Sequence, residues 1–186
     1  MEILILILAI LALVALYLIR LYNGLVRSRQ LAEEGWSGID VQLKRRADLI
    51  PNLVNTLRGY VQHERETLEA VIRARNQALS VSPGDVAARA AAEGALGQAL
   101  GKLFALAESY PDLKASENFL GLQTALETLE SEIQMARRYY NGAARELNIQ
   151  IESFPSNLVA SRFGFSKKTY FEVAESGDRA LPQVSL

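Results

Sequence analysis

The sequence predicts an all-α protein, with an N-terminal transmembrane helix, an antiparallel bundle of three to four long helices and an extended aromatic C-terminal tail. Three observations predict this class. The first residues form one uninterrupted apolar run. Beyond it, apolar residues recur at steps of three and four, the period of a buried helix face. The 186 residues include only five prolines and twelve glycines, which favours long helices over many short strands. We expect an anchor with its juxtamembrane segment at 1–24, the bundle at 25–154 and the tail at 155–186, with a disordered end.

The apolar run covers Ile3–Ile19 and contains no charged residue. At 1.5 Å per residue it spans roughly 26 Å, close to the ~30 Å hydrocarbon core of a bilayer. A cleaved signal peptide and a buried core helix are the alternatives. The first lacks a basic n-region and a cleavage site, and core helices this uniformly apolar are rare outside membranes. We therefore expect a retained anchor whose partner is the lipid bilayer.

The orientation of the anchor follows from its flanking positive charges. Arg20, Arg27 and Arg29 follow the apolar run, and no lysine or arginine precedes it. The positive-inside rule then predicts a single-pass protein of the cell membrane, with a short N-terminus outside and the C-terminal domain in the cytoplasm. An exported domain is the alternative.

Three further helical segments are predicted. The clearest is the run from Phe119 to Leu147, whose apolar steps alternate three and four like a coiled-coil seam, between a cap at Ser116 and a stop at Pro155. Residues 25–79 form either two helices or one helix kinked near Pro51, with Asp48 as a cap. Residues 85–109 are rich in alanine and glycine, and predict either close approach to a neighbouring helix or a frayed segment.

No residue pattern in the chain points to catalysis. Cysteine is absent, and the single histidine, His63, lies beside Glu64 without the further ligands that a metal site needs. The net charge of −1 lacks the basic footprint of a nucleic-acid-binding protein. The cluster Lys44–Arg46 is expected to form helical ion pairs with Asp40 or Asp48. We expect no enzyme, no metal, no cofactor and no small-molecule substrate.

Several motifs resemble those of a known bacterial family. The stretch Trp36–Val54, which reads WSGIDVQLKRRADLIPNLV, is similar to the signature of the LemA family. Further matches follow in the family's order, at Gly59–Glu64, Ala74–Arg75, Tyr110–Phe119, Ala136–Asn141, Phe154–Leu158 and Phe163–Phe165. The resemblance implies a membrane anchor followed by an antiparallel helical bundle, and it implies no established reaction.

Two functions from different classes follow. The first is a self-associating structural or scaffolding protein of the bacterial envelope, a homo-oligomer in which the tail aromatics pack between subunits or, alternatively, on their own bundle. The second is an adaptor that binds a membrane or signalling protein through the bundle end or the tail. The residues expected to carry structure or interaction lie at helix joints, along the helix seam and in the tail: Trp36, Arg46, Asp48, Pro51, Asn52, Tyr110, Pro111, Phe119, Tyr140, Phe154, Pro155, Phe163, Phe165, Tyr170 and Phe171.

Overall fold

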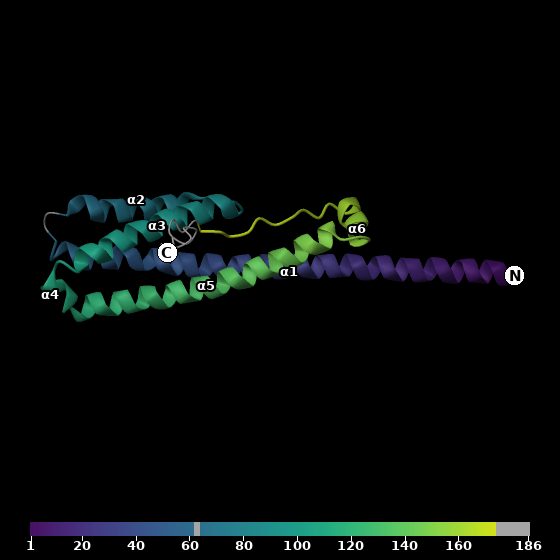
Figure 1. The fold of residues 1–186 in the computed structure, drawn as a ribbon, viewed down its shortest axis with the longest axis horizontal. Coiled ribbons are helices and arrows are strands. Elements are labelled where there is room, and N and C mark those ends of the chain that lie inside the picture. Colours follow the sequence, from purple (N-terminus) through teal and green to yellow (C-terminus); the bar gives the residue numbers. More distant parts are fainter. Residues whose placement is uncertain (62–63, 174–186) are drawn as a thin grey trace, which may run out of the picture. The chain divides into compact units, whose positions relative to one another are not determined.

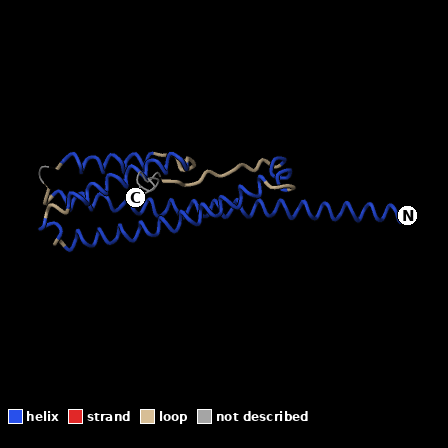
Figure 2. The backbone as a smooth tube through the Cα atoms, in the orientation of Figure 1, coloured by secondary structure: helices blue, strands red, loops and turns tan. Residues whose placement is uncertain are grey.

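A computed structural model describes residues 1–61 and 64–173, and the regular structure of these residues is entirely α-helical (Figures 1 and 2). The helices are α1 (Glu2–Arg58), α2 (Arg65–Ser80), α3 (Val86–Ala107), α4 (Pro111–Lys114), α5 (Glu117–Glu152) and α6 (Ser156–Arg162). The predicted all-α class is confirmed. The expected disordered end, from Ser176 onward, lies outside the described residues.

The chain divides into two compact units. The anchor unit contains Met1–Gly38 and Ala136–Tyr170, so it holds the first part of α1, the last part of α5, and α6. Of the described residues, the bundle unit contains those of Ile39–Met135 and residues 171–173, so it holds the rest of α1 and α5 together with α2, α3 and α4. The long helices α1 and α5 each contribute to both units.

In the bundle unit, successive long helices run in opposite directions, so that α1, α2, α3 and α5 form an up-and-down arrangement (Figure 1). Burial follows the apolar spacing of the sequence, because each helix turns its apolar face to the others. The core contains residues from all four helices, among them Ile50, Leu53, Leu57, Leu68, Val71, Leu96, Leu103, Phe119 and Leu126. The short α4 closes the turn before α5 and adds the buried Leu113.

The helix α1 continues through Pro51 to Arg58, so the prediction of a new helix capped by Asp48 is wrong. A proline inside a helix has no N–H for the carbonyl four residues earlier, which here belongs to Ala47. That carbonyl oxygen instead accepts a hydrogen bond of 2.8 Å from Nε of Arg75 on α2. The break between the first two helices comes after Arg58, and α2 begins at Arg65.

The alanine- and glycine-rich segment forms a complete helix, α3, so a frayed segment is excluded. Its start is capped by the Asp85 side chain, which accepts a hydrogen bond of 2.9 Å from the Ala88 amide. The glycines do not bring α3 into close approach with a neighbouring helix. An added Cβ at Gly94 would lie 3.2 Å from the side chain of Val173, which belongs to the extended segment after α6. An added Cβ at Gly97 or Gly101 would meet nothing within 4 Å.

In the anchor unit, the first part of α1 is long and apolar enough to cross a membrane. Its large side chains from Ile3 to Ile19 are exposed, whereas Leu25 packs in a small core with Leu147, Val159 and Ala160. After α6 the chain turns at Gly164, which has a φ of +71°, a conformation that glycine adopts without strain. The remaining residues of this unit, 165–170, are extended, as the sequence predicts for the tail.

Candidate functional site

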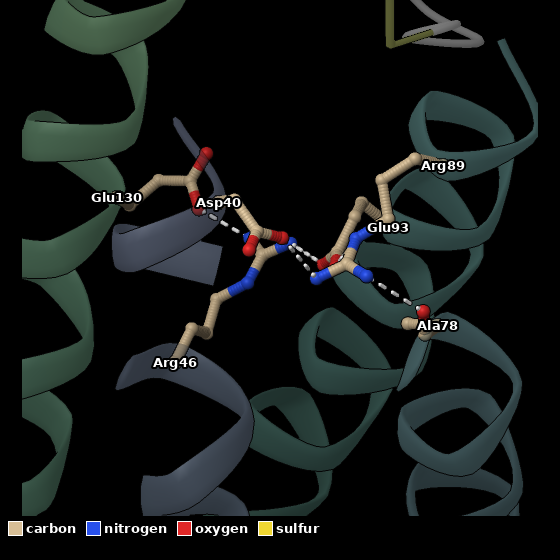
Figure 3. A network of polar contacts seen from close by, with 6 residues as sticks. All are labelled: Asp40, Arg46, Ala78, Arg89, Glu93 and Glu130. Carbon is tan, nitrogen blue, oxygen red and sulfur yellow. Dashed lines mark hydrogen bonds and ion pairs between the residues drawn. The ribbon is translucent and has the colours of Figure 1, made fainter. Parts of the chain in front are cut away.

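A network of charged side chains joins all four long helices of the bundle unit (Figure 3). At its centre, Glu93 of α3 accepts a hydrogen bond of 2.6 Å from Nη2 of Arg46 on α1. Nη1 of the same arginine donates to Glu130 of α5 at 2.7 Å. Arg89, one turn before Glu93 on α3, reaches Asp40 of α1 at 3.5 Å. The network therefore ties α1, α3 and α5 together.

The remaining long helix, α2, joins the network through its C-terminal end. Nη1 of Arg89 donates to the carbonyl oxygen of Ala78 at 3.1 Å. Carbonyls in the last turn of a helix have no partner within the helix, and a guanidinium placed there satisfies one of them and complements the helix dipole. The side chain of Arg89 thus caps α2 while its Nε lies 3.1 Å from Glu93, at an angle that makes this contact an ion pair rather than a hydrogen bond.

Burial decides what the network contributes. Arg46, Arg89 and Glu93 are all buried, and Glu93 is only 2% exposed. An ion pair of this kind adds little net stability over an apolar core, because both charges lose their hydration. Loss of one partner is costly, because it leaves the other charge buried and unpaired. The stability of the bundle unit therefore depends on the three buried charges being kept together.

The basic cluster at Lys44–Arg46 does not pair as predicted from the sequence. Arg45 forms an ion pair of 3.3 Å with Glu132 on α5, and Arg46 pairs with α3 and α5. Asp40 forms its ion pair with Arg89 of α3, at 3.5 Å. Ion pairs within one helix were expected because residues three and four apart face each other, but here the partners come from neighbouring helices.

Sequence reasoning missed Arg89 and Glu93, although a signal for them exists. They are the only charged residues between Val86 and Gly101. Opposite charges four residues apart in an otherwise alanine- and glycine-rich helix lie on the same face. Since apolar residues surround them on that face, the pair indicates a buried polar contact with another element.

A second set of contacts holds the extended segment against α5 in the anchor unit. The side-chain amide of Asn148 bonds both main-chain groups of Lys168: its Oδ1 accepts from the Lys168 amide at 2.8 Å, and its Nδ2 donates to the Lys168 carbonyl at 2.9 Å. Two turns earlier, the Tyr140 hydroxyl donates to the carbonyl of Thr169 at 2.7 Å. These contacts satisfy main-chain groups that have no strand partner.

Aromatic residues of the tail also pack on α1 of the anchor unit. Tyr22 makes edge contacts with Phe163 and Phe165, with ring centroids 4.9 and 5.8 Å apart. The guanidinium of Arg29 lies 5.1 Å from the centre of the Phe165 ring, within cation–π range. The segment docks on its own chain here, which is the alternative that the sequence left open. Its aromatic residues therefore no longer argue for an oligomer.

The residues predicted to carry structure or interaction fall into three groups. Four are buried, namely Arg46, Phe119, Tyr140 and Phe171. Five are half-buried: Trp36, Tyr110, Pro155, Phe165 and Tyr170. The ring centroids of Trp36 and Tyr140 lie 5.6 Å apart. Six are exposed: Asp48, Pro51, Asn52, Pro111, Phe154 and Phe163.

An apolar groove of about 440 Å³ lies at the end of the apolar run in the anchor unit. Its lining comes from α1 and from α6 with the residue that follows it: Leu18, Ile19, Tyr22, Leu158, Val159, Arg162 and Phe163. Arg162 is the only charged residue among them. The groove can therefore hold an apolar chain with one anionic group beside it.

Metal coordination has no visible basis in the part of the chain that the structure describes, where no cluster of three or more His, Cys, Asp or Glu side chains could hold an ion. His63, the residue considered from the sequence, lies outside that part.

The fold and these contacts define an all-helical protein. The first part of its longest helix is apolar, and buried ion pairs join the helices of its bundle unit. Residues 35–186 match the model of the LemA family, and the chain belongs to that family. It is 30% identical over 153 residues to Protein LemA of Metamycoplasma hominis, a match that covers 82% of this chain and 69% of the relative.

Magnetosome proteins are also among its relatives. Magnetosome protein MamQ 2 of Paramagnetospirillum magneticum is 27% identical over 199 residues, covering 94% of this chain and 73% of the relative. Magnetosome protein MamQ of Magnetospirillum gryphiswaldense is 25% identical over 204 residues, covering 96% and 75%. The similarity to each extends along nearly the whole of this chain.

Proposed function

We propose that this protein is a non-enzymatic, membrane-anchored scaffold of the bacterial envelope whose copies associate through the outward face of α3. The observation that carries the proposal is the composition of this face. Its exposed residues are mostly alanine and glycine: Ala87, Ala91, Ala95, Gly97, Gly101 and Ala105. Only Gln98 and Lys102 interrupt them with longer polar side chains.

A helix on the surface of a soluble bundle normally turns charged residues to the solvent. The face of α3 instead offers a flat surface on which another backbone can approach closely, as small residues allow at helix–helix contacts. Gly97 and Gly101 lie one turn apart, and the space that their Cβ atoms would occupy is empty. A helix from a second copy fits this face better than solvent does.

The apolar helix supports the anchoring part of the proposal. It would hold the protein in the cell membrane as a single span. Arg20, Arg27 and Arg29 favour a cytoplasmic C-terminal domain. Confinement of the chains to a membrane also raises their effective concentration, so that a weak contact between copies becomes sufficient.

Two further observations favour a structural role over a catalytic one. The buried charges Arg46, Arg89 and Glu93 are occupied with one another and with helix ends. Two of the relatives are named as magnetosome proteins, a name that refers to no reaction.

The test is the mass of the full-length protein after extraction in mild detergent, measured by light scattering. We expect an oligomer for the wild type. The double variant Gly97→Leu/Gly101→Leu should fold, because both positions are open and leucine is the better helix former. It should nevertheless run as a smaller particle, because the new side chains block close approach.

The matched control is Gly142→Leu on α5, where an added Cβ also meets nothing within 4 Å. This variant should keep the wild-type mass. A wild-type monomer in several mild detergents would contradict the proposal and favour the adaptor function. An oligomer unchanged by the α3 double variant would contradict the assigned face.

A further inference from the structure

We propose that α6 and the residues at its two ends form a second membrane contact, in which the groove beside α1 holds the acyl chain of a phospholipid from the bilayer that the anchor crosses. The inference rests on the anchoring part of the proposed function. It adds a lipid site that the apolar run itself does not supply.

The groove lies at the end of the apolar run. Leu18 and Ile19 line the groove and are also the last residues of the apolar run, which ends at Ile19. If this run spans the hydrocarbon core, its end lies at the boundary between acyl chains and headgroups. The groove must then lie at that boundary as well, because the same two side chains form its wall.

Large apolar side chains in and beside α6 are exposed. Phe154 before the helix, Leu158 within it and Phe163 after it are 80%, 62% and 60% exposed. Large apolar side chains gathered in this way mark a binding surface. Since α6 packs beside the end of the apolar run, the apolar phase that can cover these side chains is the bilayer itself.

The chemistry of the groove lining matches a phospholipid. The groove is apolar except for Arg162, and its α1 wall includes Tyr22. Tyrosine is enriched at the membrane interface, where its ring meets the acyl chains and its hydroxyl meets water. An arginine beside an apolar groove matches a phospholipid, whose phosphate takes the guanidinium while one acyl chain fills the groove.

The experiment uses the absence of cysteine from the chain, since any introduced cysteine becomes the single labelling site. Full-length variants Leu158→Cys, Ile10→Cys and Leu31→Cys are labelled with an environment-sensitive fluorophore. They are then reconstituted into vesicles of phosphatidylcholine and phosphatidylglycerol, with and without phosphatidylcholine brominated on its acyl chains. Ile10 reports on the apolar run, and Leu31 is an exposed residue of the same unit, roughly 18 Å along α1 from Ile19.

We expect brominated lipid to quench the fluorophore at 158 severalfold more than the one at 31, and aqueous iodide to do the reverse. The inference is overturned if position 10 is quenched by brominated lipid and position 158 is not, which leaves the anchor intact. It is also overturned if position 158 is shielded from both quenchers, because a second protein copy would then cover it. If position 10 itself escapes brominated lipid, the anchoring in the proposed function fails instead, and the lipid site with it.

A second measurement tests occupancy of the groove. Native mass spectrometry of the detergent-extracted wild type should show bound phospholipid. The variant Leu158→Glu/Arg162→Glu changes only exposed side chains and should lose that phospholipid severalfold, whereas Leu31→Glu should retain it. Equal retention by all three proteins would overturn the site.

Discussion

The Nε atom of Arg75 donates a hydrogen bond of 2.8 Å to the main-chain carbonyl oxygen of Ala47, the carbonyl that Pro51 leaves without its helical partner. A side chain of α2 thus replaces a main-chain hydrogen bond of α1. This contact compensates for the hydrogen bond that Pro51 removes from α1.

The variant Arg75→Met should lower the free energy of unfolding by about 1–3 kcal/mol, because it leaves a helix carbonyl unsatisfied in a partly buried place. The measurement is urea unfolding of the full chain in mild detergent, followed by circular dichroism. The control is Arg73→Met, which removes an exposed ion pair with Glu69 and should cost less than about 0.5 kcal/mol.

A double-mutant cycle identifies the cause. Pro51→Ala restores an N–H that can serve Ala47, so Arg75→Met should cost about 1 kcal/mol less in that background than in the wild type. If the two substitutions are additive, the arginine does not substitute for the proline's missing donor.

Substitution of the buried Glu93, at the centre of the polar network, should lower the stability far more than substitution of the exposed Glu130. Glu93→Gln removes the only buried carboxylate between Arg46 and Arg89, and should cost about 3–5 kcal/mol because two buried guanidiniums lose their counter-charge. Glu130→Gln, on a half-exposed side chain, should cost at most about 1 kcal/mol. Thermal unfolding of the two variants, each compared with the wild type, measures the two losses of stability. Equal losses would show that burial does not control the network.

The helix pattern of the sequence predicted the bundle well, because apolar spacing reports directly on burial. Phe119, Leu126, Ile133, Tyr140 and Leu147 were predicted as one face of a single helix, and all five are buried on α5. The stop at Pro155 was also placed correctly, because α5 ends at Glu152.

The continuity of α1 and the polar network could not be predicted, because both depend on contacts between residues far apart in the sequence. Pro51 reads locally as a helix start, whereas in the structure it is an interior residue whose missing hydrogen bond is replaced by the distant Arg75. Arg46 reads as a surface charge until Glu93, 47 residues away, meets it. The side chain of Asn148 gives no local sign that it will hold the Lys168 backbone.

Two glycines of α1 should respond to alanine in opposite directions. At Gly35, an added Cβ would lie 3.0 Å from the Tyr140 Cα and from the Tyr139 ring, so Gly35→Ala forces α5 away from α1 in the anchor unit. We expect a loss of about 1–3 kcal/mol, the usual cost of overpacking. At Gly38 an added Cβ meets nothing within 4 Å, and alanine should stabilise the helix by up to about 1 kcal/mol.

Thermal unfolding of these matched variants, three residues apart on one helix, separates helix propensity from packing. Stabilisation by both substitutions would show that α5 can move away from α1 at Gly35 without loss of stability. Destabilisation by both would mean that the exposed site is also constrained.

The hydroxyl of Tyr140 gives a prediction with a defined pH dependence. It donates to the Thr169 carbonyl at 2.7 Å, and burial raises the pKa of Tyr140 above its ordinary value of 10.0. Tyr140→Phe should therefore cost about 0.5–1.5 kcal/mol at neutral pH, the usual net value of one hydrogen bond. Tyr139→Phe, on the exposed neighbouring side chain, should change stability at neutral pH by less than about 0.5 kcal/mol.

The sign of the alkaline effect follows from proton binding. Above about pH 10 the unfolded chain has lost the Tyr140 proton while the folded protein still holds it, so the stability of the wild type falls as the pH rises toward the raised pKa. The Phe variant has no such proton to lose. The stability advantage of the wild type over Tyr140→Phe should accordingly be constant up to about pH 9 and shrink above pH 10. Urea unfolding of both proteins across this range measures the gap directly. A gap that stays constant or widens in alkali would show that the phenol is not held in its neutral form against the extended segment.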